Sequence, residues 1–100
     1  MQAEYVLRRT DAEGEWFSLM DHEAFCAALT PATRQVTILE GPGKFCFEIA
    51  TTTFSFVWED PGISVVCVGD MHIEEQLAIL TELLEQIRTA TGETGRIMEL

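Results

Sequence analysis

The sequence has little positive charge. Lysine and arginine together number six against 17 aspartates and glutamates, which gives a formal net charge of -11. Because nucleic-acid binding depends on basic side chains that neutralise phosphates, this balance argues against a nucleic-acid partner. The same charge attracts basic proteins and speeds their encounter. An equally weighted alternative is that the acidic surface serves solubility alone.

Long hydrophobic runs and a targeting segment are missing as well. The longest uncharged apolar-rich run, Ile49 to Trp58, is rich in threonine and too short to span a bilayer. The first five residues include an early acid and no apolar segment of a signal peptide. The cysteines are odd in number and lack the dense, even spacing of a disulfide scaffold: Cys26, Cys46 and Cys67. We therefore expect a cytoplasmic protein with no membrane partner.

Motifs that carry chemistry are absent or incomplete. Gly41-Pro42-Gly43-Lys44 lacks the spacing of a phosphate-binding loop and is typical of a hairpin turn. His72-Ile73-Glu74 is not followed by the Pro-Cys-x-x-Cys of zinc deaminases, and His22 and Cys26 lack two further metal ligands. No nucleophile elbow occurs, and no cysteine neighbours a basic group. We predict no catalytic residue, cofactor or metal; a small enzyme is the least favoured alternative.

What the sequence does contain is the pattern of a single α+β domain over residues 1–100. Alternating apolar residues between Gln35 and Gly69 predict a four-strand antiparallel meander, divided by turn signals at 41–43, 50–53 and 60–62. One register gathers the bulky side chains on a single face. In the first hairpin of this register Ile38 faces Phe47. In the second, Ile49 faces Phe54, Phe47 faces Phe56 and Phe45 faces Trp58. In the third, Trp58 faces Val65 and Phe56 faces Cys67.

Two helices and two terminal segments complete the prediction. Asp21 is expected to cap a short helix from about His22 to Leu29. A longer helix follows, with Asp70 as a plausible cap, Gly92 as its stop and an apolar stripe of Ile73, Leu77, Leu80, Leu84 and Ile87, widened by Ile79 and Leu83. Glu4–Arg9 and Glu15–Leu19 could form a hairpin, and Arg96–Leu100 an edge strand. We predict a two-layer sandwich with both helices on one sheet face.

The opposite face of the meander is the main candidate for binding. Its centre is rich in valine and its flanks carry glutamates, as in a recognition surface with an apolar middle and a charged rim. The expected partner-binding residues are Glu48, Val57, Glu59, Asp60 and Val66, together with Trp16, because tryptophan is enriched at binding hot spots. Two alternatives stay open for this face: a homodimer, or cover by the N-terminal hairpin or the C-terminal tail. For Trp16 a core role is somewhat favoured.

In size, acidity, lack of catalytic groups and order of elements, the chain resembles the small immunity proteins of bacterial polymorphic toxin systems. The likeness extends loosely over the whole chain, and its nearest approach to a signature is the segment from Phe54 to Gly62. The resemblance implies binding and neutralisation of a cognate toxin, with Glu48, Glu59 and Asp60 meeting its lysines or arginines. A secretion chaperone, a self-associating regulatory subunit and a nucleic-acid mimic are the alternatives.

Overall fold

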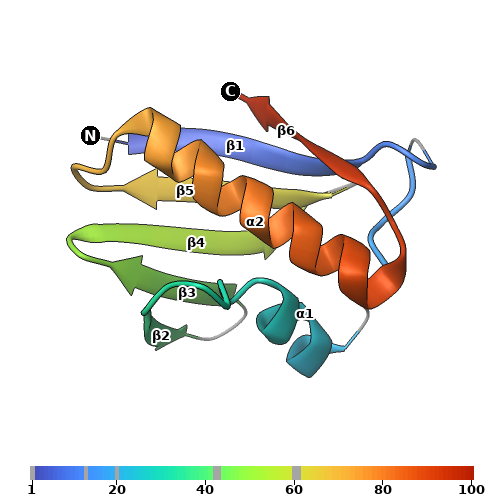
Figure 1. Ribbon diagram of the computed structural model, residues 1–100, viewed down its shortest axis with the longest axis horizontal. Coiled ribbons are helices and arrows are strands. Elements are labelled where there is room, and N and C mark those ends of the chain that lie inside the picture. The colour runs from blue at the N-terminus through green and yellow to red at the C-terminus, as the bar shows by residue number, and fades with distance from the viewer. Residues whose placement is uncertain (1, 13, 20, 42–43, 60–61) are drawn as a thin grey trace.

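An antiparallel sheet of six strands forms one layer of the molecule, and two helices lie together on one of its faces (Figure 1). The computed structural model describes residues 2–12, 14–19, 21–41, 44–59 and 62–100, with the backbone alone for residues 40, 41 and 44. The strands follow the order β2-β3-β4-β5-β1-β6 across the sheet. The elements are β1 (Gln2–Arg9), α1 (His22–Ala28), β2 (Thr37–Gly41), β3 (Lys44–Ile49), β4 (Thr52–Trp58), β5 (Ile63–Val68), α2 (Ile73–Thr91) and β6 (Gly95–Glu99). The predicted α+β sandwich is confirmed.

The predicted meander forms β2 to β5, but two of its three pairings are displaced by two residues. Phe54 faces Phe47 rather than Ile49, and Val65 faces Phe56 rather than Trp58. Between β2 and β3, Ile38 faces Phe47 as expected. The β3–β4 turn contains just Ala50 and Thr51, with Ala50 at a φ of 55°, whereas the prediction assumed four residues. Because a shift of two leaves every side chain on its original face, the inward set is still the predicted one.

The predicted N-terminal hairpin is wrong. Residues 15–19 form no strand, and β1 instead lies between β5 and β6, with Tyr5 facing both Val65 and Glu99. Both edges of β1 are therefore occupied, which leaves no place for a second N-terminal strand. The C-terminal segment does form the expected edge strand, β6 (Figure 1).

The helices differ from the prediction in one cap. Asp21 caps α1 as expected, since its carboxylate accepts from the Ala24 amide at 2.8 Å. The cap of α2 is His72, whose Nδ1 accepts from the Glu74 amide at 3.3 Å, rather than Asp70. Met71 explains the later start: its amide donates to Thr52 Oγ1 at 3.0 Å, which ties this residue to the sheet. At the other end, Gly92 stops α2 with a φ of 79°, as predicted.

The core lies between the helices and the inward face of the sheet, here called the covered face. Phe47 is at its centre, with ring centroids 5.1 Å from Phe54 and 5.4 Å from Phe56. The buried stripe of α2 is rotated slightly from the predicted one, since Ile73 is 47% exposed and the buried set is Gln76, Ile79, Leu80, Leu83 and Ile87. Gln76 is buried because its Oε1 accepts from the Tyr5 hydroxyl at 2.6 Å.

Candidate functional site

The second face of the sheet, here called the open face, carries no covering layer in the part of the chain that the structure describes. Both helices lie on the other side, and β1 and β6 extend the sheet in its own plane (Figure 1). The N-terminal and C-terminal segments therefore do not fold over this face, and the cover alternative is wrong. Recognition of a partner and self-association are the two alternatives that remain.

The centre of the open face is apolar. The registers place Ser64 between Val6 and Val57, and Val66 between Glu4 and Ser55, on β1, β5 and β4. Val57 and Val68 are 38% and 47% exposed. Exposed valines gathered on one face are uncommon on a monomer and typical of an interaction surface.

The charges of the open face are balanced. Among the side chains that the structure describes on it, Glu4 and Glu48 are acidic, and Arg8 and Arg96 are basic. Arg8 faces Arg96 across the β1–β6 pair, and neither forms an ion pair with a described residue. The Nε atom of Arg8 is buried and has no hydrogen-bond partner among the described residues. This face therefore lacks the acidic excess that the net charge suggested for it.

The sequence-predicted binding residues do not form one patch. Glu48, Val57 and Val66 lie on the open face. Glu48 is level with the start of β4 while Glu59 follows its end, so about 20 Å of strand separate the two. The ring of Trp16 packs against Trp58 on the helix side, with centroids 5.2 Å apart, and is 42% exposed. Asp60 lies outside the described residues.

The acidic excess lies instead on the helical layer. The two helices with their caps carry six carboxylates and one guanidinium, that of Arg88, which gives this layer a net charge of -5. The carboxylates are those of Asp21, Glu23, Glu74, Glu75, Glu82 and Glu85. All but Glu82 belong to exposed residues, so the charge faces solvent.

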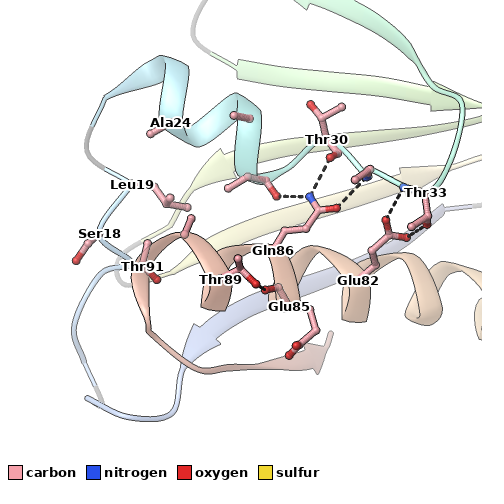
Figure 2. A pocket seen from close by; sticks show the side chains of 14 residues that line it. Ser18, Leu19, Ala24, Thr30, Thr33, Glu82, Glu85, Gln86, Thr89 and Thr91 are labelled. Carbon is pink, nitrogen blue, oxygen red and sulfur yellow. Dashed lines mark hydrogen bonds between the residues drawn. The ribbon is translucent and has the colours of Figure 1, made fainter.

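A groove runs between α1 and α2 and is here called the acidic groove (Figure 2). It has a volume of about 630 Å³, and Glu82 and Glu85 lie along its α2 side. Five alanines line it: Ala24, Ala27, Ala28, Ala32 and Ala90. The groove thus combines an apolar floor of methyl groups with carboxylates at its rim. Sequence reasoning missed it, although the spacing of Ala24, Ala27 and Ala28 on α1 is that of one small-residue helix face.

Polar contacts fix the walls of the acidic groove. Gln86 donates to the carbonyl oxygens of Ala28 and Thr30 at 3.0 and 2.9 Å and accepts from the Ala32 amide at 2.8 Å. Glu82 accepts from the amide and hydroxyl of Thr33 (Figure 2). Burial raises the pKa of Glu82, but the hydrogen bonds from Thr33 and Arg34 outweigh it and the pKa is lowered. Glu82 therefore stays charged while it holds the 30–34 segment.

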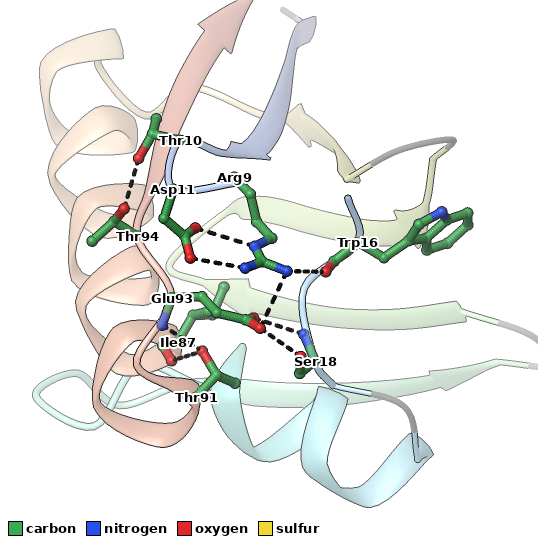
Figure 3. A network of polar contacts seen from close by, with 9 residues as sticks. All are labelled: Arg9, Thr10, Asp11, Trp16, Ser18, Ile87, Thr91, Glu93 and Thr94. Carbon is green, nitrogen blue, oxygen red and sulfur yellow. Dashed lines mark hydrogen bonds and ion pairs between the residues drawn. The ribbon is translucent and has the colours of Figure 1, made fainter. Parts of the chain in front are cut away.

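A second polar cluster is structural. Glu93 is 8% exposed and accepts from the amide and the hydroxyl of Ser18, and it forms an ion pair with Arg9 at 3.3 Å (Figure 3). Arg9 also donates to the Trp16 carbonyl oxygen at 3.0 Å and pairs with Asp11 at 2.8 Å. These contacts join the segment between β1 and α1 to the end of α2, and their acceptors are all used within the fold.

The thiols differ in their surroundings, and Cys26 Sγ lies 3.4 Å from His22 Nε2 on α1. Three or more histidine, cysteine or acidic side chains do not converge on a metal-sized site anywhere in the described residues. Burial raises the pKa of the Cys67 thiol to about 12, which keeps it protonated and unreactive. Within the described ranges, no helix has the length and apolar character to cross a membrane.

No family model matches this chain, and the searches of curated proteins and of solved structures found no match. Two surfaces on opposite sides of the sheet are the candidates for function. The open face is apolar and charge-balanced, whereas the acidic groove is apolar at its floor and negative around it.

Proposed function

We propose that this chain is a protein-binding module that acts as a bacterial immunity protein, neutralising a basic toxin in the cytoplasm by binding it through the acidic groove. The observation that carries the proposal is an apolar groove, with Glu82 and Glu85 at its rim, on a helical layer whose net charge is -5. An apolar centre with a charged rim is the usual anatomy of a protein-binding surface.

The charge also favours a basic partner for kinetic reasons. A surface of one sign raises the association rate of an oppositely charged protein, by about 10-fold to 1000-fold at low salt. Glu74 and Glu75 are exposed and form no ion pair with a described residue, and Glu85 pairs with Arg88 alone. Glu74 and Glu75 are therefore available to lysines and arginines of a partner, whereas Glu85 is already paired with Arg88.

The groove supports this role better than the surface expected from the sequence. On the open face Glu4 and Glu48 are offset by Arg8 and Arg96, so a strongly basic protein gains little there. Glu59 stands apart from Glu48 at the other end of β4. A basic partner therefore binds at the helical layer rather than at the open face.

A growth experiment tests the function itself. The product of the reading frame next to the gene should arrest growth when expressed alone and should not when this chain is co-expressed. Purified together, the two proteins should form a complex. Full toxicity in the presence of this chain, or a failure of the two to bind, would contradict the immunity role.

Association kinetics then test the surface. Changing Glu74, Glu75 and Glu85 to glutamine should slow association with the toxin about tenfold at low salt and flatten its salt dependence. The matched control changes Glu4 and Glu48 on the open face and Glu59 beyond the end of β4 to glutamine, which removes the same charge away from the groove and should alter the rate less than twofold. A slower rate in the control than in the groove variant would return the binding site to the open face.

A further inference from the structure

We infer that the open face is the surface through which two copies of this chain associate, as a homodimer of two sheets packed face to face. The open face and the acidic groove lie on opposite sides of the sheet, so this inference does not depend on the immunity role (Figure 1).

Charge selects a second copy as the occupant. A chain with a net charge of -11 repels itself, and it can associate with its own kind where the local charge cancels. The helical layer, at -5, does not meet this condition. On the open face Glu4 and Glu48 are matched by Arg8 and Arg96, around a centre rich in valine. Such a face complements itself better than it complements a strongly basic or acidic protein.

The order of residues on β1 fits a two-fold axis. Glu4, Val6 and Arg8 point to the open face in succession, with Val6 midway between the two charges. A two-fold axis that lies between the sheets and crosses β1 at Val6 places Arg8 of each copy opposite Glu4 of the other. The two contacts are equivalent, as an isologous interface requires. Val6, which is 6% exposed in the single chain, lies at the centre between these two contacts.

The size of the face is sufficient for a dimer of modest affinity. Six strands about 4.8 Å apart and about 20 Å long cover about 500 Å². Two copies therefore bury about 1,000 Å² in total, near the lower limit for a specific interface. We accordingly expect a dimer that dissociates on dilution.

Sedimentation of the full chain tests the inference with charge variants. The wild-type chain should be a concentration-dependent dimer. Glu4→Arg and Arg8→Glu should each raise the dissociation constant at least tenfold. In each variant, both of the symmetry-related contacts between residues 4 and 8 bring two like charges together. The combined variant Glu4→Arg/Arg8→Glu should restore it to within about threefold. Glu75→Arg on the helical layer changes the net charge as Glu4→Arg does and should not weaken the dimer.

Mixing the two single variants makes the test independent of their separate stabilities. The Glu4→Arg chain and the Arg8→Glu chain, each monomeric alone, should form a mixed dimer, since both contacts across the axis are then attractive. Circular dichroism checks that each variant is folded. A wild-type monomer at the highest concentration reached would overturn the inference. The inference would also be overturned if the wild-type chain dimerises but the combined variant Glu4→Arg/Arg8→Glu does not recover the wild-type dissociation constant. Such a dimer would form through an edge strand or another surface.

Discussion

The two faces of the sheet are built from the same strands, yet they carry different kinds of apolar residue. Toward the helices stand the large rings, with Phe45, Phe47, Phe54 and Phe56 all buried. Toward the open side the alternate positions carry valine and serine, and Val57 and Val68 are well exposed. A sheet that is apolar on both sides is therefore covered first where its side chains are largest, because large rings gain most from leaving water. The smaller residues remain on the uncovered face, where we propose that a second copy binds.

The largest expected loss of stability comes from a substitution in the core of the covered face. Phe47→Ala removes the ring that stacks on Phe54 at 5.1 Å and should lower the free energy of unfolding by about 3–5 kcal/mol. Val66→Ala on the open face, measured by urea denaturation at a dilution where the chain is monomeric, should cost less than about 1 kcal/mol. Equal losses in the two variants would mean that the open face is buried within a single chain.

The two faces can also be compared through the reactivity of one cysteine on each. Cys67 points to the covered face with its pKa raised to about 12 by burial, whereas Cys46 points to the open face and donates to Ser55 Oγ at 3.3 Å. The raised pKa leaves very little of the Cys67 thiol as the reactive thiolate at neutral pH. Iodoacetamide followed by peptide mass spectrometry should label Cys46 far faster than Cys67.

Concentration sharpens the thiol comparison. Labelling of Cys46 should slow in concentrated protein, where the open face is paired, and that of Cys67 should not change. Labelling of Cys67 at the rate of Cys46 in the native chain would show that the covered face is accessible to solvent.

A smaller effect concerns the attachment of the helical side. Glu93→Gln removes the charge that accepts from Ser18 and pairs with Arg9, and should cost about 2 kcal/mol at neutral pH. Burial raises the pKa of Glu93, but the hydrogen bonds from Ser18 and the charge of Arg9 outweigh it and lower the pKa below 4.5. The folded state is thus stabilised above pH 4.5, and this contribution disappears as the pH falls through the lowered pKa.

The measurement for Glu93 is the free energy of unfolding of both chains between pH 3 and pH 7. The difference between wild type and Glu93→Gln should shrink toward the acid end, and the dimer dissociation constant should be the same for both at pH 7. A difference that is constant over the whole pH range would show that the Glu93 charge does not stabilise the fold.

The sequence was a reliable guide to which face each strand residue occupies and a poor guide to its cross-strand partner. The inward set of Phe47, Phe56 and Cys67 follows from period-two alternation, which any even shift preserves. The pairing itself depends on turn length, and the two-residue turn at Ala50 was not recognised because alanine seldom adopts a positive φ.

The binding surfaces were harder to predict because they depend on distant residues. The acidic groove brings together α1, the 30–33 segment and α2, and its wall is held by Gln86, which bonds residues more than 50 positions away. The balance of charge on the open face depends on β1 and β6, whose places in the sheet no local pattern fixes. The net charge alone therefore led to the prediction of an acidic excess on the open face, whereas the excess lies on the helical layer.

The position of β1 has a consequence for the order of folding. Hairpins β2–β3, β3–β4 and β4–β5 join neighbours in the sequence, whereas β1 pairs with strands about 60 and 90 residues away. Closing such long loops costs entropy before any contact compensates for it, so distant pairings form slowly. We expect the first strand of the chain to be among the last to dock, entering a slot between β5 and β6 that later residues must first create.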